Sequence, residues 1–557
     1  MRIWKLSHGK DIRDDWYNDA LNKNFVMVHE DTLSKGQNTI SQGDNFTKYV
    51  NEGDVFYLCR GNSSIVLIGC FKGECNIDKD GWAYRKYDIL FKAKNNKGYS
   101  GNSHWWTPNN NSTFIEINQK DQPVFETEIL KPFFGVDLLD LENKLSVILK
   151  SRKKMESYKK LLESNHNLIL TGAPGTGKTY LAKEIAKAMG CSDEEIGFVQ
   201  FHPSYDYTDF VEGLRPIQDD NTGAIGFERK DGVFKAFCER ALRCLTGNQQ
   251  ISNFDNVYNA FVNDIIENGN DIELETPIQK RKFNVKINNN GKLVAIPQTG
   301  TGTEITITKE MLQIYIESDK ITDWKSYVTS IVPYMKLKYG EMLSEKTPNK
   351  DAKFVFIIDE INRGEISKIF GELFYAIDPG YRGSEKCSNL QTHYANLQRI
   401  PNEFDSFLNI KDSDNYGHFF VPENVYIIGT MNDIDRSVES MDFAFRRRFA
   451  FKEIKAEENI GMLDNLDSSI KEKAINCMIN LNKAIEKTEG LSSAYHIGAS
   501  YFLKLKNYDN DFGQLWDYHI EGLLREYLRG YPNIEDSLNK LKSAYDNENQ
   551  DDSSDNN

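Results

Sequence analysis

The chain has 557 residues, of which 39% are apolar, so it is too long for a single hydrophobic core and we expect two to four domains. Its formal net charge of −15 argues against a protein coated in nucleic-acid-binding surface. No apolar run approaches the ~20 residues that span a bilayer, and the first residues lack a signal-peptide core, so we expect a cytoplasmic protein without membrane contact. The eight cysteines stand singly, without the spacing of a metal site, as is usual for reduced thiols.

Residues 1–130 are predicted to form a compact, mostly-β domain. Two β-type runs, Val55–Cys59 and Ile65–Gly69, flank a short turn and predict a hairpin. Residues 1–120 hold 16 Lys and Arg against 14 Asp and Glu, whereas the rest of the chain holds 52 against 69. This N-terminal part is therefore the better electrostatic candidate for a nucleic-acid contact.

The rest of the chain divides into further segments. Leucine and isoleucine at helical spacing predict a linker helix within residues 131–164. Apolar strands alternate with helical segments over 165–455, the pattern of a parallel α/β sheet, with an insertion at about 248–345. Residues 456–545 are predicted to be a helical lid, and 546–557 an acidic, disordered tail. The predicted sheet strands are Leu168–Leu170, Gly197–Phe201, Phe354–Ile358 and Val425–Gly429.

A glycine-rich, phosphate-binding loop follows the first of these strands. Residues 172–179 read Gly-Ala-Pro-Gly-Thr-Gly-Lys-Thr, the complete pattern, between a strand and a helix. Lys178 supplies a positive charge to the β- and γ-phosphates of a nucleoside triphosphate, and the Thr179 hydroxyl can bind Mg²⁺. The next helix points the positive end of its dipole at the same phosphates. The predicted nucleotide-binding residues are Gly172, Pro174, Gly175, Thr176, Gly177, Lys178 and Thr179.

Two adjacent carboxylates, Asp359 and Glu360, end the apolar strand Phe354–Ile358. Asp359 is placed to hold Mg²⁺ together with Thr179, because the phosphate-binding loop alone cannot hold the ion. Glu360 can polarise the water that attacks the γ-phosphate. An acidic pair after an apolar strand also occurs by chance, but downstream of a phosphate-binding loop it predicts nucleotide hydrolysis.

Two further motifs extend this predicted site. The apolar run from Ile427 ends in Asn432, whose amide can orient a water near the γ-phosphate. Arginines occupy positions 446–448, and they form either a solvated basic patch or an arginine finger that reaches the γ-phosphate bound to a neighbouring subunit. Such a finger accelerates hydrolysis by about 10³–10⁵. It implies a ring with sites at subunit interfaces, and Arg447 and Arg448 are the candidates.

Six stretches carry a resemblance to a known family: Phe201–Tyr205, Asp209–Pro216, Asp359–Arg363, Met431–Ser437, Arg446–Phe449 and Ile497–Phe502. Together they cover about residues 165–530. The set resembles the AAA+ ring ATPases, and specifically the McrB-type motor subunit of modification-dependent restriction systems. In that family the Met-Asn-x-x-Asp-Arg-Ser element supplies Asn432 and Asp435 to nucleotide turnover, and we assign Arg363 an assisting role.

The resemblance implies further properties. Its best-known members hydrolyse GTP, but no Asn-Lys-x-Asp motif reads guanine here, so the expected substrate is GTP or ATP with Mg²⁺ as cofactor. It also implies a homo-hexamer and a partner nuclease subunit of the McrC type, since this chain has no nuclease signature of its own. Family members usually carry Thr-Ala where this chain has Asp433 and Ile434, so an additional carboxylate stands beside the water-orienting amide.

The N-terminal part contains the stretches Gly53–Tyr57, Ile65–Gly73 and Trp82–Arg85. They resemble EVE-type and YTH-type modules of the PUA-like group. This resemblance implies that a modified DNA base is taken out of the stack and held between aromatic rings, where stacking gains about 1–3 kcal/mol per base. Trp82, Trp105 and Trp106 lie in polar stretches and are the candidates for this role; ordinary packing in a small domain is the alternative for each of them.

The predicted fold class is therefore α/β, with a parallel AAA+ sheet, a phosphate-binding loop and a helical lid, preceded by a small mostly-β PUA-like domain. The predicted function is a ring-forming NTPase that recognises modified DNA and drives a separate nuclease. One alternative is a MoxR-like AAA+ remodelling ATPase whose N-terminal domain binds protein. A second is a nucleotide-gated DNA-binding switch in which Asp433 slows hydrolysis. Binding of methylated oligonucleotides tests the first alternative, and steady-state nucleotide turnover tests the second.

Overall fold

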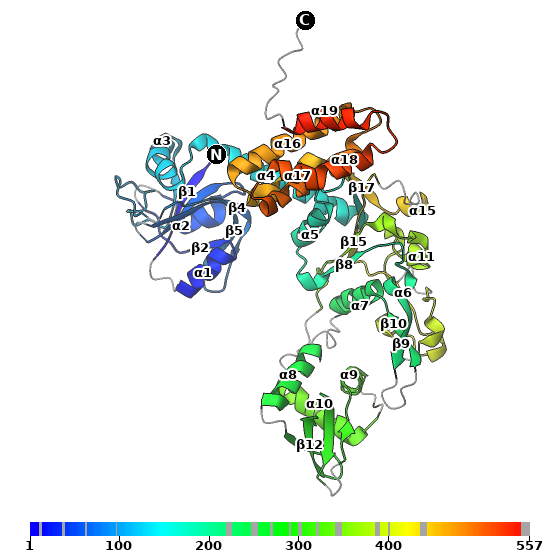
Figure 1. Cartoon of the computed structure of the whole chain (residues 1–557). Coiled ribbons are helices and arrows are strands. Elements are labelled where there is room, and N and C mark those ends of the chain that lie inside the picture. Colours follow the sequence, from blue (N-terminus) through cyan, green and yellow to red (C-terminus); the bar gives the residue numbers. More distant parts are fainter. Residues whose placement is uncertain are drawn as a thin grey trace. The chain divides into compact units, whose positions relative to one another are not determined.

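The computed structural model divides into two compact units, Met1–Ser157 and Tyr158–Asn557, which are taken one at a time (Figure 1). In the ranges described below, no helix is both long and apolar enough to cross a bilayer. The structure describes residues 1–9, 14–35, 39–61, 64–95, 97–218, 225–246, 254–267, 271–288, 291–298, 303–318, 321, 323–339, 348–384, 390–398, 401–434 and 443–546.

The N-terminal unit is built on a mixed six-stranded sheet in the order β2-β5-β4-β3-β1-β6. β1 and β3 are parallel and every other pair is antiparallel, so the predicted hairpin is confirmed as β3 and β4. The strands are β1 Ile3–His8, β2 Phe25–His29, β3 Val55–Arg60, β4 Ser64–Ile77, β5 Trp82–Lys92 and β6 Phe114–Ile117. The helices are α1 Asp14–Asn22, α2 Gln42–Asp44, η1 Asn45–Tyr49, α3 Gln122–Phe125 and η3 Glu126–Phe134.

Both faces of this sheet are covered, and the central strand β3 is accordingly buried at five consecutive positions rather than at alternate ones. On one face Val55 and Tyr57 pack with residues of α3 and η3. On the other face Phe56 and Leu58 pack with Trp4. Helix α4, Leu138–Asn165, begins in this unit and continues past its boundary.

The second unit contains a five-stranded parallel sheet in the order β17-β7-β16-β15-β8. All four predicted strands are confirmed. The fifth strand, β17, pairs with the strand that leads into the glycine-rich loop and was not predicted, because four residues are too few to show an apolar pattern. The strands are β7 Asn167–Thr171, β8 Ile196–Gln200, β15 Phe354–Asp359, β16 Val425–Thr430 and β17 Ala450–Glu453. A separate hairpin pairs β9 Glu212–Gln218 with β10 Ile225–Asp231.

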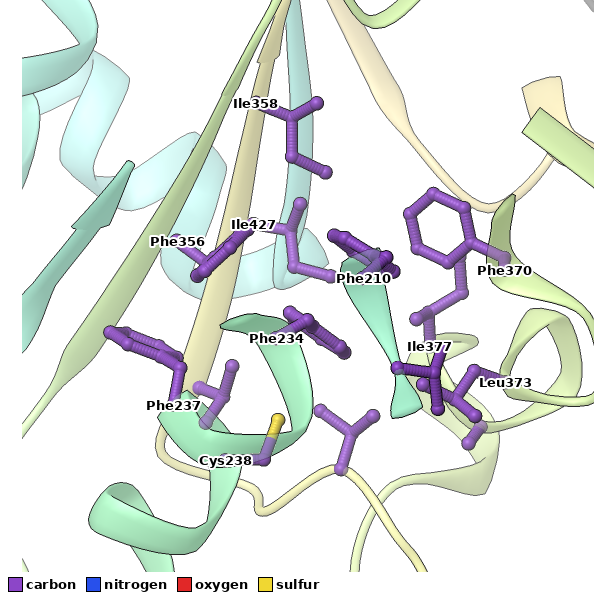
Figure 2. Packing of buried hydrophobic residues seen from close by; sticks show 14 of the residues in the cluster. Phe210, Phe234, Phe237, Cys238, Phe356, Ile358, Phe370, Leu373, Ile377 and Ile427 are labelled. Carbon is purple, nitrogen blue, oxygen red and sulfur yellow. The ribbon is translucent and has the colours of Figure 1, made fainter. Parts of the chain in front are cut away.

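An aromatic core packs against this sheet (Figure 2). Phe210 stacks on Phe234 with centroids 4.8 Å apart, and Phe234 meets Phe356 of β15 edge-on at 5.1 Å. Gly197 of β8 is required here, since a Cβ would lie 2.4 Å from the ring of Phe356. The surrounding helices are α5 Lys178–Ala188, α6 Tyr207–Phe210, α7 Val233–Thr246, α11 Ile366–Phe370, α12 Leu373–Ala376, α14 Glu403–Phe407 and α15 Phe443–Arg446.

Within the predicted insertion, a four-stranded antiparallel sheet in the order β11-β12-β13-β14 carries three helices and a hydrophobic core of its own. Val285 of the sheet and Ile331 of the last helix are completely buried in that core. The elements are α8 Phe254–Glu267, β11 Ile272–Glu275, β12 Lys282–Ile287, β13 Leu293–Pro297, β14 Ile305–Thr306, α9 Lys309–Ser318 and α10 Lys325–Tyr339.

The segment after the parallel sheet is helical. The helical spacing of Ile470, Ala474, Met478, Leu481 and Ile485 predicted one buried face. In the longest helix of the segment the last four are buried and Ile470 is partly buried. The predicted disordered tail lies, from residue 547 on, outside the described residues. The elements are η9 Ala456–Asn465, α16 Ser468–Lys487, η11 Ala499–Tyr508, α17 Phe512–Leu515, η12 Trp516–Ile520, α18 Glu521–Tyr527 and α19 Ile534–Asp546.

Candidate active site

The glycine-rich loop joins β7 to α5 and turns its backbone sharply three times. Gly172, Gly175 and Gly177 have φ values of 141°, 77° and 81°, which residues with a Cβ rarely adopt. A Cβ on Gly172 would also lie 2.4 Å from the carbonyl oxygen of Ile454. The glycines are therefore needed for backbone conformation and, at Gly172, for close packing as well.

Lys178 lies inside this loop, at the first residue of α5. Its side chain is almost completely buried, and its Nζ donates to the carbonyl oxygens of Gly172, over 2.9 Å, and Ala173, over 2.8 Å. The N–H groups of the first turn of a helix have no partner within the helix and attract anions. The ammonium and this helix end together concentrate positive charge at one point, which suits a triphosphate.

Three oxygen-bearing side chains from three elements meet beside the loop. The Thr179 hydroxyl donates to Asp359 Oδ1 over 2.6 Å, and the Thr430 hydroxyl donates to the same oxygen over 2.7 Å. They meet because β7, β16 and β15 are neighbours in a parallel sheet, so their carboxyl ends lie at one edge. Oxygen ligands are those that Mg²⁺ prefers, so Thr179 and Asp359 fit this ion.

Glu360 is held next to Asp359 by an unusual backbone conformation. Its φ of 52° and ψ of 45° are in the left-handed region, where a residue other than glycine costs about 1–3 kcal/mol. Its Oε1 accepts a hydrogen bond of 2.7 Å from Asn432 Nδ2, and its Oε2 lies 3.3 Å from Arg363 Nε. The structure thus brings the predicted Glu360, Asn432 and Arg363 together, with the carboxylate fixed between an amide and a guanidinium.

The two residues that follow Asn432 contact other parts of the site. The Asp433 backbone N–H donates to the Gly172 carbonyl over 3.4 Å. Desolvation raises the pKa of the Asp433 carboxyl, and the positive charge of Lys178 acts in the opposite direction. Ile434 packs against the core of the helical segment. Asp435 lies outside the described residues, so its role stays a prediction.

The three arginines at 446–448 differ in environment. Arg448 is 8% exposed, with its guanidinium 4.5 Å from the ring centroid of Phe374 and 3.6 Å from the Asp378 carboxylate. Arg446 and Arg447 are exposed, and within the described ranges the Arg447 side chain has no hydrogen-bond or ion-pair partner. Arg448 is therefore committed to packing in its own chain, whereas Arg447 is accessible to a neighbouring molecule.

The helical segment after the sheet is hydrogen-bonded directly to the glycine-rich loop. A Cβ on Gly498 would lie 2.1 Å from the carbonyl carbon of Gly175, so the two backbones are in contact. The loop and the helical segment are therefore joined through backbone atoms as well as through a side chain. Three hydrogen bonds make the connection: Gly498 N–H to Pro174 O (3.1 Å), Ser500 N–H to Gly175 O (3.0 Å) and Asn459 Nδ2 to Thr176 O (2.8 Å).

Two residues of this site were not predicted from the sequence. Thr430 ends the recognised strand, and its position opposite the acidic pair could have identified it. Asn459 has no local signal, because it lies in an irregular helical turn, with φ −119°, 283 residues from its partner Thr176. Sequence motifs found the chemical groups at the strand ends but not the side chain that connects the loop to the helical segment.

The candidate base-binding tryptophans of the N-terminal unit lie in different environments. Trp82 begins β5 and is half-buried, with Trp16 and His29 edge-on to its ring at 6.0 and 5.2 Å. Trp105 and Trp106 lie in the loop before β6. Trp106 is only 3% exposed, with its ring stacked on His104, so its polar neighbours in the sequence did not place it at the surface.

Trp105 is 50% exposed and lines a hollow of about 920 Å³. The loop that carries Trp105 is anchored by Lys5, which is completely buried. The Lys5 Nζ donates to the Thr107 and Asn110 carbonyls over 2.7 and 2.8 Å. Burial lowers the pKa of Lys5 to about 8. Of the three predicted tryptophans, Trp105 therefore has the most exposed ring, and the loop that carries it is anchored by a buried lysine.

Comparison with known proteins gives consistent matches for the second unit. Residues 167–299 and 298–449 match the AAA domain of the dynein-related subfamily, and residues 473–535 match the α-helical lid domain of McrB. A relative is the Escherichia coli (strain K12) type IV methyl-directed restriction enzyme EcoKMcrB subunit, 26% identical over 383 residues, or 67% of this chain. That alignment spans 55% of the E. coli subunit, so the chain covers little more than half of this relative's length. Another is the Bacillus subtilis (strain 168) type II restriction enzyme BsuMI component YdiS, 22% identical over 62% of this chain and 71% of that protein.

Proposed function

Because this chain belongs to the AAA+ family, in the dynein-related subfamily, and has a McrB-type lid, we propose that it is the GTP- or ATP-hydrolysing motor subunit of a modification-dependent DNA restriction system. One observation carries the proposal. Four residues from three separate motifs, Thr179, Asp359, Glu360 and Asn432, meet through side-chain hydrogen bonds at the glycine-rich loop. A loop that only bound phosphate would not need the strained Glu360 or its amide partner.

Each side chain has a role in hydrolysis. Lys178 binds the β- and γ-phosphate oxygens. Thr179 and Asp359 would hold Mg²⁺, which would supply further positive charge to the same phosphates. Glu360 accepts a proton from the attacking water, which Asn432 orients. The water oxygen bonds to the γ-phosphorus as the bond to the β–γ bridging oxygen breaks, which yields a nucleoside diphosphate and inorganic phosphate.

Arg447 completes this site from a neighbouring subunit. It is exposed and follows α15, whereas Arg448 is already paired within its own chain. An arginine that stabilises the charge of the transition state in trans makes hydrolysis depend on assembly. We therefore propose a homo-hexameric ring, in agreement with the resemblance to McrB-type motors.

Modified DNA is recognised by the N-terminal unit in this proposal. The hollow beside Trp105 provides an exposed aromatic ring on a supported loop, where a flipped base can stack. The name of the E. coli relative, a methyl-directed restriction enzyme, supports methylated DNA as the target. Cleavage falls to a separate nuclease subunit of the McrC type, because no nuclease motif is present in this chain.

Phosphate release by the purified chain with Mg²⁺ and either GTP or ATP tests the proposal. Lys178→Ala is expected to abolish turnover, because the β- and γ-phosphates lose their positive partner. Lys183→Ala, on the same helix but 4.9 Å from the Phe198 ring at the surface, is the matched control and should retain activity. The proposal fails if neither nucleotide is hydrolysed, alone or with the partner nuclease, or if Lys178→Ala retains wild-type turnover.

A further inference from the structure

The inserted domain formed by residues 254–339 carries a surface that nucleotide hydrolysis does not use. Its sheet and its three helices enclose a separate hydrophobic core, so its surface residues are not needed to complete the parallel sheet. In Figure 1 this domain is the green region that includes α8, α9, α10 and β12. One face of it combines exposed aromatic and basic side chains.

This face is a hollow of about 450 Å³ between the β11–β12 turn and the start of α10. The turn is closed by Thr276, whose N–H donates to the Arg281 carbonyl over 2.9 Å and whose hydroxyl accepts from the Arg281 N–H over 3.0 Å. Ser330 of α10 donates to the Glu275 carbonyl over 2.8 Å, which ties the helix to the end of β11. Both walls are therefore held by hydrogen bonds. The lining residues are Thr276, Ile278, Gln279, Arg281, Lys282, Phe283, Pro297, Trp324, Lys325, Ser326 and Tyr327.

An aromatic platform forms one side of the hollow. Trp324 is 50% exposed although an indole ring gains from burial. Its backbone has a φ of 51°, and its carbonyl accepts from the N–H groups of Tyr327 and Val328, so it caps the start of α10 in a strained conformation. The Tyr327 ring centroid lies 6.5 Å from that of Trp324 and 4.9 Å from that of Phe283. The exposed indole thus lies next to Tyr327, which in turn packs against Phe283.

The charge of the hollow is positive in a chain whose net charge is −15. Arg281, Lys282 and Lys325 line it, and its lining includes no carboxylate. The charge of Lys282 is neutralised by Glu273, whose Oε1 lies 2.6 Å from the Lys282 Nζ. Arg281 and Lys325 have no acidic partner in the part of the chain that the structure describes. Two uncompensated cations therefore flank an exposed indole.

We propose that this face binds single-stranded nucleic acid, with an unpaired base stacked on Trp324 and backbone phosphates held by Arg281 and Lys325. Aromatic stacking together with cations along the backbone is how proteins bind single strands without reading sequence. Duplex DNA offers no free base face, so the contact selects unpaired strands. DNA and RNA share this chemistry, and the site neither requires a modified base nor depends on NTP hydrolysis. It is therefore distinct from the proposed reader around Trp105.

Fluorescence anisotropy with the full-length chain and unmodified 20-nucleotide DNA and RNA single strands tests this inference. Trp324→Ala is expected to lower affinity about tenfold, whereas Trp324→Phe retains most of it, because the stacking surface is kept. The double variant Arg281→Gln/Lys325→Gln loses two phosphate contacts. The slope of the logarithm of its association constant against log [salt] is therefore expected to be shallower by about 1.4, or about 0.7 for each contact. Lys336→Gln is the control, because it removes one exposed charge about 16 Å from Lys325 along α10. It should change neither the affinity for single strands nor the salt dependence.

Two results separate this inference from the proposed function. NTP hydrolysis without nucleic acid is unchanged in every variant, and the ratio of affinities for modified and unmodified duplex stays at the wild-type value. Comparison of the DNA and RNA strands shows which source is preferred. The inference is overturned if both the Trp324→Ala and the double-glutamine variants bind single strands like wild type. It is equally overturned if the only change in these two variants is that the partner nuclease no longer affects their NTP hydrolysis, because the face would then bind protein.

Discussion

Functional residues were predicted from the sequence both at the nucleotide site and in the N-terminal unit. The structure brings the first set together, whereas it gives the members of the second set different environments. At the nucleotide site, Asp359 lies 180 residues from Thr179 in the sequence yet within hydrogen-bond distance of it. In the N-terminal unit, Trp105 and Trp106 are adjacent in the sequence, yet one is half-exposed and the other buried. Parallel strands force residues at their carboxyl ends together, whereas an aromatic residue in a loop has no such constraint. Motifs at strand ends are thus better guides to a site than aromatic content.

After the complete loss of turnover expected for Lys178→Ala, the largest effect is expected at Arg447. Arg447→Ala should lower turnover by about 10³–10⁵, because the transition state loses a charge supplied in trans. Mixing Arg447→Ala subunits with Lys178→Ala subunits should restore part of the activity, since some interfaces then combine an intact loop with an intact arginine. Phosphate release from the mixture measures this. If mixing two inactive variants restores nothing, the site is not shared between subunits.

Glu360→Gln is expected to lower the rate of hydrolysis by about 10²–10⁴ while nucleotide binding is kept, because the amide cannot accept the proton of water. Single-turnover hydrolysis and equilibrium binding of a labelled nucleotide separate these two effects. Glu365→Gln, an exposed carboxylate five residues further on, is the control. Wild-type hydrolysis by Glu360→Gln would show that this strained carboxylate has another role.

In the N-terminal unit, Trp105→Ala should weaken binding of methylated duplex about tenfold, as expected for one lost stacking contact. Trp16→Ala removes another exposed indole of the same unit, outside the hollow, and should leave affinity unchanged. Anisotropy with methylated and unmethylated duplexes measures both variants. A larger loss for Trp16→Ala than for Trp105→Ala would place the reader at the Trp16–Trp82 pair instead.

The smallest expected effect is at Asp433. Asp433→Thr removes a carboxylate that interacts electrostatically with Lys178 and would compete there with the γ-phosphate, so turnover should rise about threefold and the KM for nucleotide should fall. Steady-state kinetics at neutral pH give both values. Slower turnover in this variant would mean that the carboxylate assists the reaction instead of restraining it.

Much of the second unit followed from its sequence. The four predicted strands, the helix after the glycine-rich loop and the buried face of α16 were visible because apolar periodicity reports burial directly. The short strand β17 and the contact between Asn459 and the loop were not, because each depends on tertiary packing over nearly 300 residues. The buried Lys5 was also missed, since a lysine in a sequence predicts a surface position. The environments of the arginines at 446–448 required the structure as well.

The central claim is that two copies of the chain share one nucleotide site, and mass measurement of the Glu360→Gln variant in solution with Mg²⁺ and GTP or ATP tests it most directly. This variant is expected to keep nucleotide binding and to hydrolyse very slowly, so a particle of six times the 64.1 kDa chain is predicted in the presence of one of these nucleotides. A further Arg447→Ala substitution in the same chain should lower the fraction of this particle. A chain that stays monomeric with either nucleotide at saturation would contradict the account.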